Sequence, residues 1–239
     1  MRFVPTLQLD PYYYTPLWPD TVSLAAMQAQ AMIDAGKATE ADFAAVVANS
    51  RQNAKSNPNA QLAGDVSAED VLKEDYLVEP LRKSDCCPIT DGASSLMMVT
   101  REVAEKLIAE GKISGAAYIK AIDHRIEPHG LGVRDLTVSE STRIAGEKAG
   151  VANGDVDIAE LYAPFSHQEI LIKEALGLAE NTKVNPSGGT LAGHIFMTHG
   201  LDRIGEVATR LIKGEGKRGV AHSTSGACLQ QNLVTVLEV

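Results

Sequence analysis

The residues best suited to chemistry lie in one glycine-rich stretch, Asn185-Pro-Ser-Gly-Gly-Thr-Leu-Ala-Gly-His194, just before a helical pattern over 201–213. Glycine lets the backbone approach a ligand closely. A helix start adds unpaired N–H groups and a positive dipole end. An imidazole placed there could act as an acid, a base or a donor to an oxyanion. A glycine-rich turn with an ordinary histidine explains the stretch about equally well.

Tyr162 and Phe165, in Tyr-Ala-Pro-Phe, follow a predicted strand over 156–161. In open α/β sheets, ligands lie beyond the carboxyl ends of the strands. Tyr162 could therefore donate a hydrogen bond to a substrate oxygen. Two ordinary core aromatics fit the same pattern better when it is taken alone.

The chain has three cysteines, Cys86, Cys87 and Cys228, and no Cys-x-x-Cys pair. An odd count without that spacing predicts a reducing compartment, no disulfide framework and no metal site. Cys228 could be a reactive thiol, although a free cysteine is more often a small buried apolar residue. We expect Cys86 and Cys87 to be structural.

The composition is that of a soluble globular protein, with a formal net charge of -9 that argues against nucleic acid as a partner. No apolar run approaches the roughly 20 residues that span a bilayer, and the chain does not open with a charged and then apolar leader. We therefore expect a cytoplasmic protein with no membrane span.

The predicted elements change in kind near residue 85. Residues 1–84 carry helix signals and loops without a clear strand, including a capping box at Thr39. From 85 to 239 strands alternate with helices, which predicts an α/β sheet with helices packed on it. The expected strands cover 89–100, 116–122, 156–161, 183–185, 218–224 and 233–239. We also expect a capping box at Ser166 and a loop that carries His124 and His129.

Four ordered blocks resemble the thiolase family. They are Asp91-Gly-Ala-Ser, Asn185-Pro-Ser-Gly-Gly, Gly193-His194 before a helix led by Gly200, and Ser225-Gly-Ala-Cys-Leu-Gln-Gln-Asn. The order is most similar to sterol-carrier-protein-type thiolases and lipid-transfer-protein-like acetyl-CoA acetyltransferases. That family has two α/β halves, each a five-stranded mixed sheet with helices on both faces. The resemblance covers a loop region, 1–84, and the C-terminal half, 85–239. It implies that the N-terminal half, which carries the acylated cysteine, is missing.

The resemblance implies roles for a few residues. His194 matches the histidine that activates the nucleophilic cysteine and helps to hold the thioester oxygen. Tyr162 stands where the family positions a water or an oxygen in the oxyanion hole. Ser223 and Cys228 lie near the expected second cysteine, the acid/base of the condensation. The expected substrate-binding residues are Phe165, Asn185, Ser187, Gly188, Gly189 and Gly193.

Three functions remain open at this point. The first is formation or thiolytic cleavage of a C–C bond in acyl-CoA thioesters, with coenzyme A thioester as substrate and no cofactor. The second is retro-aldol cleavage of a β-hydroxyacyl-CoA, because related thiolase-fold aldolases use tyrosine. The third is a non-catalytic binding subunit of a split thiolase. A lone half would expose an apolar face. We therefore expect a homo- or hetero-oligomer, with an N-terminal thiolase half or an OB-fold acyl-CoA-binding protein as partner.

Overall fold

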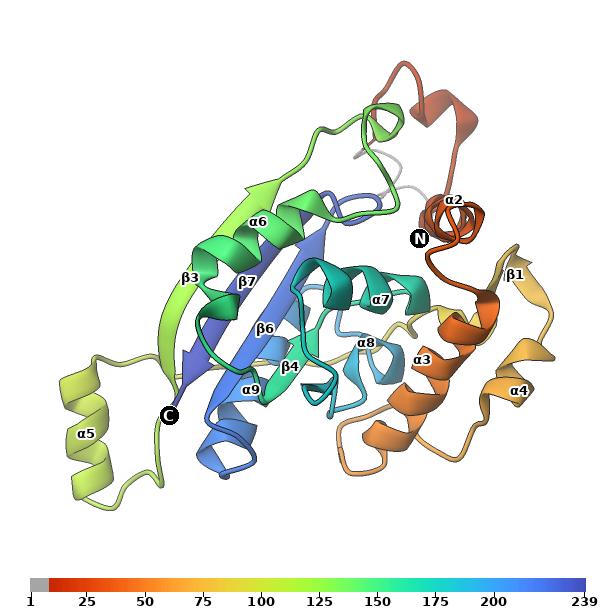
Figure 1. Ribbon diagram of the computed structural model, residues 1–239. Helices are drawn as coiled ribbons and strands as arrows, with labels where there is room; N and C mark the ends of the chain where they lie inside the picture. Colours follow the sequence, from red (N-terminus) through yellow and green to blue (C-terminus); the bar gives the residue numbers. More distant parts are fainter. Residues whose placement is uncertain (1–8) are drawn as a thin grey trace.

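A mixed five-stranded sheet forms the centre of the computed structural model, which describes residues 9–239 (Figure 1). From edge to edge the strands are β3 (Tyr118–Ile126), β7 (Gln231–Glu238), β6 (Arg218–Ser225), β4 (Ile158–Leu161) and β5 (Lys183–Val184). β7 pairs antiparallel with β3 and with β6, whereas β4 pairs parallel with β6 and with β5. The predicted α/β class and mixed sheet are confirmed. His124 lies within β3 and pairs with Leu233, so its expected place in a loop is wrong.

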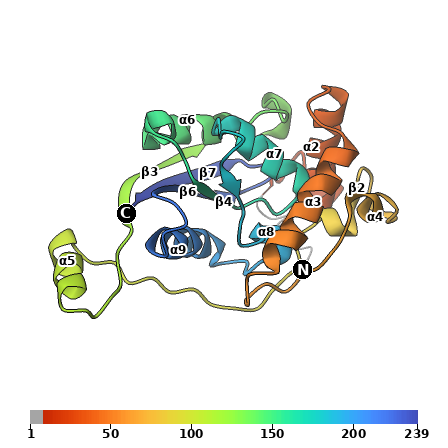
Figure 2. The ribbon, with the colours of Figure 1, turned by 60° about the horizontal axis from the view of Figure 1, so that its bottom comes forward.

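Helices cover both faces of this sheet, as predicted (Figure 2). α6 (Glu140–Ala149) and α7 (Ser166–Ala175) lie on one face, and α9 (His199–Ile212) lies on the other. α9 buries Val207 and Leu211 against Ile158, Ala221 and Leu237 of the strands. α6 ends at Gly150, which takes the left-handed conformation that glycine favours. Among residues 9–239, none of the helices combines the length and the apolar character needed to cross a membrane.

The N-terminal part is mostly helical. It contains α2 (Thr21–Asp34), α3 (Glu40–Ala54), α4 (Ala68–Leu72) and a short hairpin of β1 (Tyr76–Val78) and β2 (Leu81–Arg82) that the sequence did not predict. The capping box at Thr39 is confirmed, because its hydroxyl accepts from the N–H of Asp42 and its N–H donates to the Asp42 carboxylate. Short 3-10 turns cover Thr15–Leu17, Lys83–Asp85, Leu131–Val133 and Val151–Asn153.

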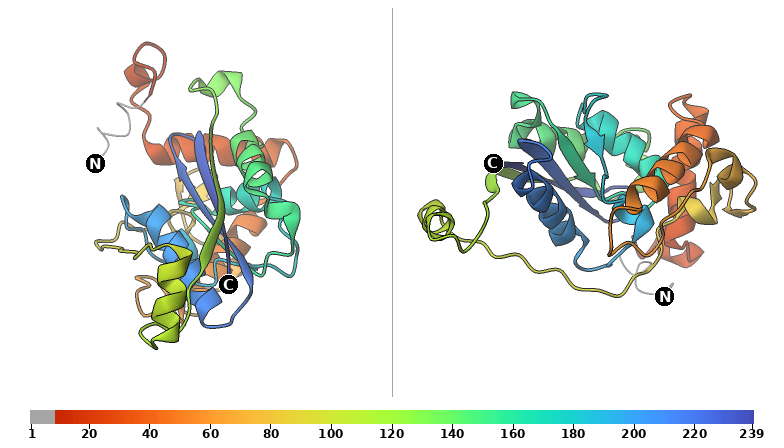
Figure 3. Two further views of the ribbon diagram at one scale, coloured as in Figure 1. Left: turned by 90° about the vertical axis from the view of Figure 1, so that its left-hand side faces the viewer. Right: turned by 90° about the horizontal axis from the view of Figure 1, so that it is seen from below.

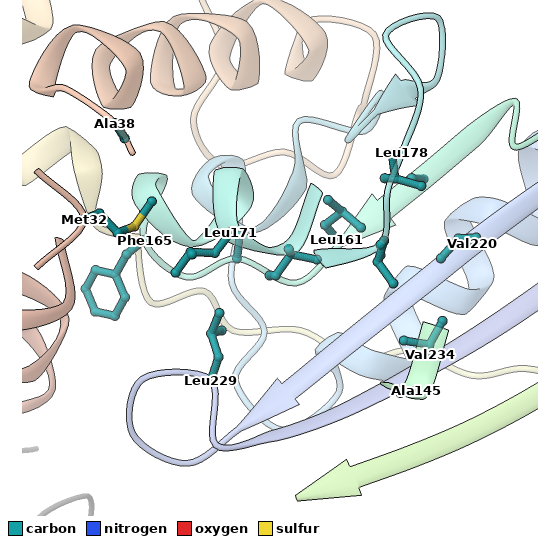
Figure 4. Packing of buried hydrophobic residues seen from close by; sticks show 14 of the residues in the cluster. Met32, Ala38, Ala145, Leu161, Phe165, Leu171, Leu178, Val220, Leu229 and Val234 are labelled. Carbon is teal, nitrogen blue, oxygen red and sulfur yellow. The ribbon is translucent and has the colours of Figure 1, made fainter. Parts of the chain in front are cut away.

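One apolar core joins this helical part to the sheet. Met32 of α2 belongs to the same buried cluster as Phe165, Leu171 of α7, and Val234 of β7 (Figure 4). The first eight residues of the predicted 1–84 region lie outside the described residues. The domain boundary at 84/85 stays a prediction. It marks the change from helices and loops to the α/β sheet, and both parts share one apolar core.

The expected buried strand over 89–100 is wrong. These residues have no regular secondary structure, and Met97 and Met98 are 86% and 75% exposed. Figure 3 shows the segment as an extended trace leading to α5 (Arg101–Ala109), which projects from the body. The apolar pattern is that of a strand, but a strand also needs a neighbour to pair with, and this segment pairs with no strand of residues 9–239.

Ser166 does not cap α7, so the expected capping box there is also wrong. Phe165 is the N-cap residue and makes no side-chain cap bond. The Ser166 hydroxyl instead donates to the carboxylate of Asp85, with 2.6 Å between the oxygens. This contact fixes the residues before the 86–90 segment against the start of α7.

Candidate active site

Tyr162 and His194 form a buried pair at the carboxyl end of β4. Tyr162 follows the last residue of that strand, and its N–H donates to the carbonyl of His222 on β6. His194 lies between the short helix α8 (Gly189–Ala192) and α9. The phenol oxygen is 2.6 Å from Nε2 of the imidazole, and the two residues are 5% and 4% exposed. The structure therefore brings together the two residues that the sequence singled out first.

Residues 86–90 form backbone hydrogen bonds on both sides of this pair, and we call this segment the 86–90 bracket. The N–H of Cys87 donates to the carbonyl of Pro164 at 2.9 Å, two residues after Tyr162. The N–H of Thr90 donates to the carbonyl of His194, and the His194 N–H donates back to the Thr90 hydroxyl, both at 2.9 Å. As a result, Sγ of Cys87 lies 3.3 Å from Nδ1 of His194. No pattern in the sequence indicates this contact, and Cys87 was expected to be structural.

His199 and Ser223 stand on the α9 side of the pair. The His199 ring stacks on Tyr162, with ring centroids 3.3 Å apart and planes at 13°. Its Nδ1–H donates to the carbonyl of Phe196. A methyl group on Gly200, at the start of α9, would lie 2.8 Å from the Ser223 hydroxyl, so Ser223 lies against the first turn of α9. His199 therefore faces the site.

Burial keeps the groups of this site uncharged near neutral pH. It lowers the pKa of His194 to about 4, with smaller contributions from the nearby His199 and Arg203. Burial also raises the pKa of Tyr162 above its ordinary value and raises the pKa of the Cys87 thiol to about 12. The phenol, the imidazole and the thiol thus meet as neutral donors and acceptors. Such a set can pass a proton or hold a developing negative charge.

The polar residues of the glycine-rich stretch are used by the fold itself. Asn185 accepts from the N–H of Leu161 at 2.7 Å and donates to the Glu169 carboxylate at 2.6 Å. The N–H and hydroxyl of Ser187 both donate to Glu160, with which Arg203 also forms a buried ion pair. These contacts place the loop before His194, and they do not support the expected ligand contacts of Asn185 and Ser187.

The glycines of this stretch serve close packing. Gly188 has a φ of 92°, and a methyl group there would lie 2.7 Å from the side chains of Ala54 and Ala192. Gly189, with a φ of 63°, is as close to the amide of Asn185. The pair therefore packs closely against α3 and its own turn, and the expected substrate contact of both glycines stays a prediction. Gly193 has ordinary extended backbone and no close neighbour.

Phe165 and Cys228 contact the core instead of the Tyr162–His194 pair. Phe165 is 6% exposed, and its ring centroid lies 6.1 Å from that of the buried His167. The thiol of Cys228 donates to the carbonyl of Leu24 on α2 at 3.4 Å. Neither contact favours a role in substrate binding or proton transfer.

Solved structures with this arrangement of sheet and helices are α/β proteins of thiolase-like fold. Human mitochondrial 3-ketoacyl-CoA thiolase matches with a TM-score of 0.73 at 15% identity, over 98% of this chain and 62% of that one. The structure titled Ltp2-ChsH2(DUF35) aldolase matches with a TM-score of 0.74 at 22% identity, over 95% of this chain and 68% of that one.

The chain belongs to the thiolase family, because residues 116–237 match the model of the family described as Thiolase, C-terminal domain. It is 30% identical over 227 residues to acetyl-CoA acetyltransferase of Methanothermobacter thermautotrophicus, covering 85% of this chain and 58% of that protein. It is 27% identical over 234 residues to benzoylsuccinyl-CoA thiolase subunit BbsB of Thauera aromatica, covering 87% of this chain and 60% of that protein. The resemblance seen in the sequence is confirmed, and the chain spans 58% to 60% of the length of these two relatives.

Proposed function

We propose that this chain supplies the Tyr162–His194 part of an active site that forms or breaks a C–C bond in acyl-CoA thioesters. The observation that carries the proposal is the 2.6 Å contact between the phenol and Nε2, buried at the end of β4. The similarity to an acetyl-CoA acetyltransferase and to a thiolase subunit supports the substrate class. Coenzyme A thioesters are then substrates, and the reaction needs no further cofactor.

In the acyl-transfer reaction, the neutral imidazole of His194 is the base. A cysteine thiol that enters beside the pair gives its proton to Nε2, and the thiolate then attacks the thioester carbonyl. When the tetrahedral oxyanion collapses, the C–S bond to coenzyme A breaks, and the departing thiolate takes the proton back from the imidazolium of His194, which leaves the acyl group on the cysteine. The O–H of Tyr162, released from Nε2, donates to the oxyanion that forms. Because both residues are buried, this donor acts where water competes little, and one such donor is typically worth about 10²–10³ in rate.

The acylated cysteine comes, in this proposal, from a partner half that covers an apolar surface beside the site. Met97, Met98 and Met197 are 75% to 86% exposed, and Phe196 is 55% exposed. The Phe196 ring lies edge-on to His194, with centroids 5.4 Å apart, so one of these exposed apolar side chains reaches the site itself. An exposed apolar patch next to buried polar groups is typical of a protein interface. The chain's coverage of only 58% to 60% of its relatives' length leaves room for such a half.

Retro-aldol cleavage of a β-hydroxyacyl-CoA is the second candidate, and the phenol–imidazole contact favours it. The substrate hydroxyl would give its proton to the Tyr162 oxygen while the Tyr162 proton passes to Nε2 of His194. The C–C bond then breaks into an aldehyde or ketone and the enolate of the shorter acyl-CoA, which takes a proton back at carbon. This route needs no cysteine.

The test replaces His194 by Ala in the chain assembled with its partner and measures C–C bond cleavage of acyl-CoA substrates. We expect the rate to fall by about 10²–10³. His124→Ala, at an exposed position on the edge strand β3, is the matched control and should keep full activity. Cleavage that depends on free coenzyme A identifies the thiolase reaction, and cleavage without it identifies the aldolase. Unchanged turnover in His194→Ala would refute both and leave the role of a binding subunit.

A further inference from the structure

Two side chains contact the imidazole of His194, one at each ring nitrogen. Sγ of Cys87 is 3.3 Å from Nδ1, and the oxygen of Tyr162 is 2.6 Å from Nε2. In a neutral imidazole one nitrogen carries the proton and donates, and the other accepts. Cys87 and Tyr162 therefore cannot both donate to the ring or both accept from it. If Cys87 accepts a hydrogen bond from Nδ1, Nε2 is the nitrogen that accepts from Tyr162.

The shorter contact indicates where the ring proton is. Hydrogen bonds donated by O–H are typically about 2.7–2.8 Å long, and those donated by N–H about 2.9–3.0 Å. A separation of 2.6 Å between Tyr162 and Nε2 fits an O–H donor. Nε2 is then the acceptor, so Nδ1 carries the proton and directs it at the sulfur of Cys87. A thiol sulfur is a weak acceptor, and the 3.3 Å contact suits one.

We propose that Cys87 is a positioning residue: its sulfur accepts the Nδ1–H bond of His194, and this holds Nε2 free to take the proton of Tyr162. The catalytic meaning of this inference rests on the proposed function. In most buried histidines that act as bases or metal ligands, a carboxylate or a carbonyl holds the second nitrogen. A carboxylate would also favour the charged imidazolium. A neutral sulfur fixes the tautomer without that effect, so the imidazole stays an uncharged base.

The backbone around Cys87 shows that the sulfur is held in place. Its N–H is tied to Pro164, Cys86 forms a β-bridge with Phe165, and Thr90 exchanges two hydrogen bonds with His194. One short segment is thus hydrogen-bonded both to the residues after Tyr162 and to His194. These backbone contacts on both sides place Sγ of Cys87 at 3.3 Å from Nδ1.

Cys86 provides a matched control within the same segment. Its thiol donates weakly to the carbonyl of Arg82 at 3.6 Å and makes no contact with His194. Replacing Cys86 therefore tests what the loss of a half-buried thiol does to the bracket. Replacing Cys87 tests the same loss together with the loss of the acceptor at Nδ1.

The experiment reads the ring nitrogens of His194 by NMR in the full chain labelled with ¹⁵N-histidine, with His194→Asn assigning the signals. In the wild type we expect the Nδ1–H tautomer. Cys87→Ala should move the tautomer ratio about tenfold toward Nε2–H, because a buried donor loses its acceptor. Cys87→Ser should retain the wild-type tautomer, because a hydroxyl also accepts, and Cys86→Ala should change nothing. Cys87→Asp should raise the pKa of His194 from about 4, since it sets a charge at Nδ1.

A wild-type protein in the Nε2–H tautomer would overturn the inference without the need for any variant to fold. So would a Cys87→Ala protein with the wild-type tautomer ratio. Activity separates this result from the proposed function. If the tautomer changes as expected but Cys87→Ala keeps full turnover in the assembled enzyme, the positioning role stands and the proposed use of Nε2 as the base fails.

Discussion

Three buried imidazoles should make this protein sensitive to mild acid. His167, His194 and His222 are between 0% and 4% exposed. Burial lowers the pKa of His167 from 6.5 to about 3 and that of His222 to about 4. His194 is lowered to about 4 in the same way. As the pH is lowered, each histidine therefore becomes charged at a higher pH in the unfolded chain than in the folded one.

The sign follows from the direction of these shifts. A pKa that is lower in the folded state means that the unfolded chain binds more protons between pH 6.5 and 4, so stability is complete above 6.5 and falls as the pH is lowered. Each histidine contributes about 1.4 kcal/mol per pH unit, or about 4 kcal/mol per pH unit for the three. Glu169 works in the opposite direction, because burial raises its pKa from 4.5 to about 7. The net loss is then about 3 kcal/mol between pH 6 and pH 5, a large part of the roughly 5–15 kcal/mol that stabilises a typical domain.

The assay is urea denaturation of the chain at pH 7.5, 6.5, 6.0 and 5.0, in steps chosen to bracket about 6.5, with the free energy of unfolding taken at each pH. His222→Gln should lower the slope by about 1.4 kcal/mol per pH unit, since glutamine keeps a polar group near Asn232 without a titrating ring. His124→Gln, on an exposed strand position, should leave the slope unchanged. A flat free energy between pH 6.5 and 5, or a His222→Gln slope equal to the wild type, would refute the reasoning.

Three further substitutions test how the fold holds the site, each by urea denaturation at neutral pH. Gly188→Ala should lower the free energy of unfolding by about 2 kcal/mol or more, because its new methyl group meets α3. Gly36→Ala, at a similar positive φ in open space, is the control and should cost clearly less. Equal losses would contradict the packing argument. Arg203→Leu should cost about 3 kcal/mol by removing the buried ion pair with Glu160, which keeps only the more distant Arg210 at 4.0 Å, and a loss below about 1 kcal/mol would show that the pair is not structural. Thr39→Ala should cost about 1 kcal/mol through the lost cap of α3, and no change would mean that the helix end is held elsewhere.

The fold was largely predictable because its signals are local. The cap at Thr39, the glycine after α6 and the alternation of strand and helix each follow from a few neighbouring residues. Element ends were less predictable where pairing decides them. β3 continues to Ile126, through His124, because β7 offers partners along its whole length. Ser166 looked like a cap but is drawn to Asp85, a residue 81 positions away in the sequence.

The candidate site was predictable only in part. His194 and Tyr162 were found because one follows a strand and the other precedes a helix, and those positions meet at one edge of a sheet. Asn185 and Ser187 were expected to contact substrate, but the residue types that suit a ligand also suit a tight buried turn. Cys87 was missed because its contact with the imidazole spans 107 positions and depends on backbone pairing that no local pattern records.

The wrong prediction over residues 89–100 carries information of its own. The pattern there is that of a buried strand, yet Met97 and Met98 face solvent and the segment pairs with no strand of residues 9–239. The sheet ends at β3 and at β5 within residues 9–239, so the apolar character of this segment is not used by strand pairing in the described part of the chain. The same stretch of chain begins with the 86–90 bracket that places Cys87 against His194. The unpaired segment is therefore continuous in the chain with the residues that contact the imidazole.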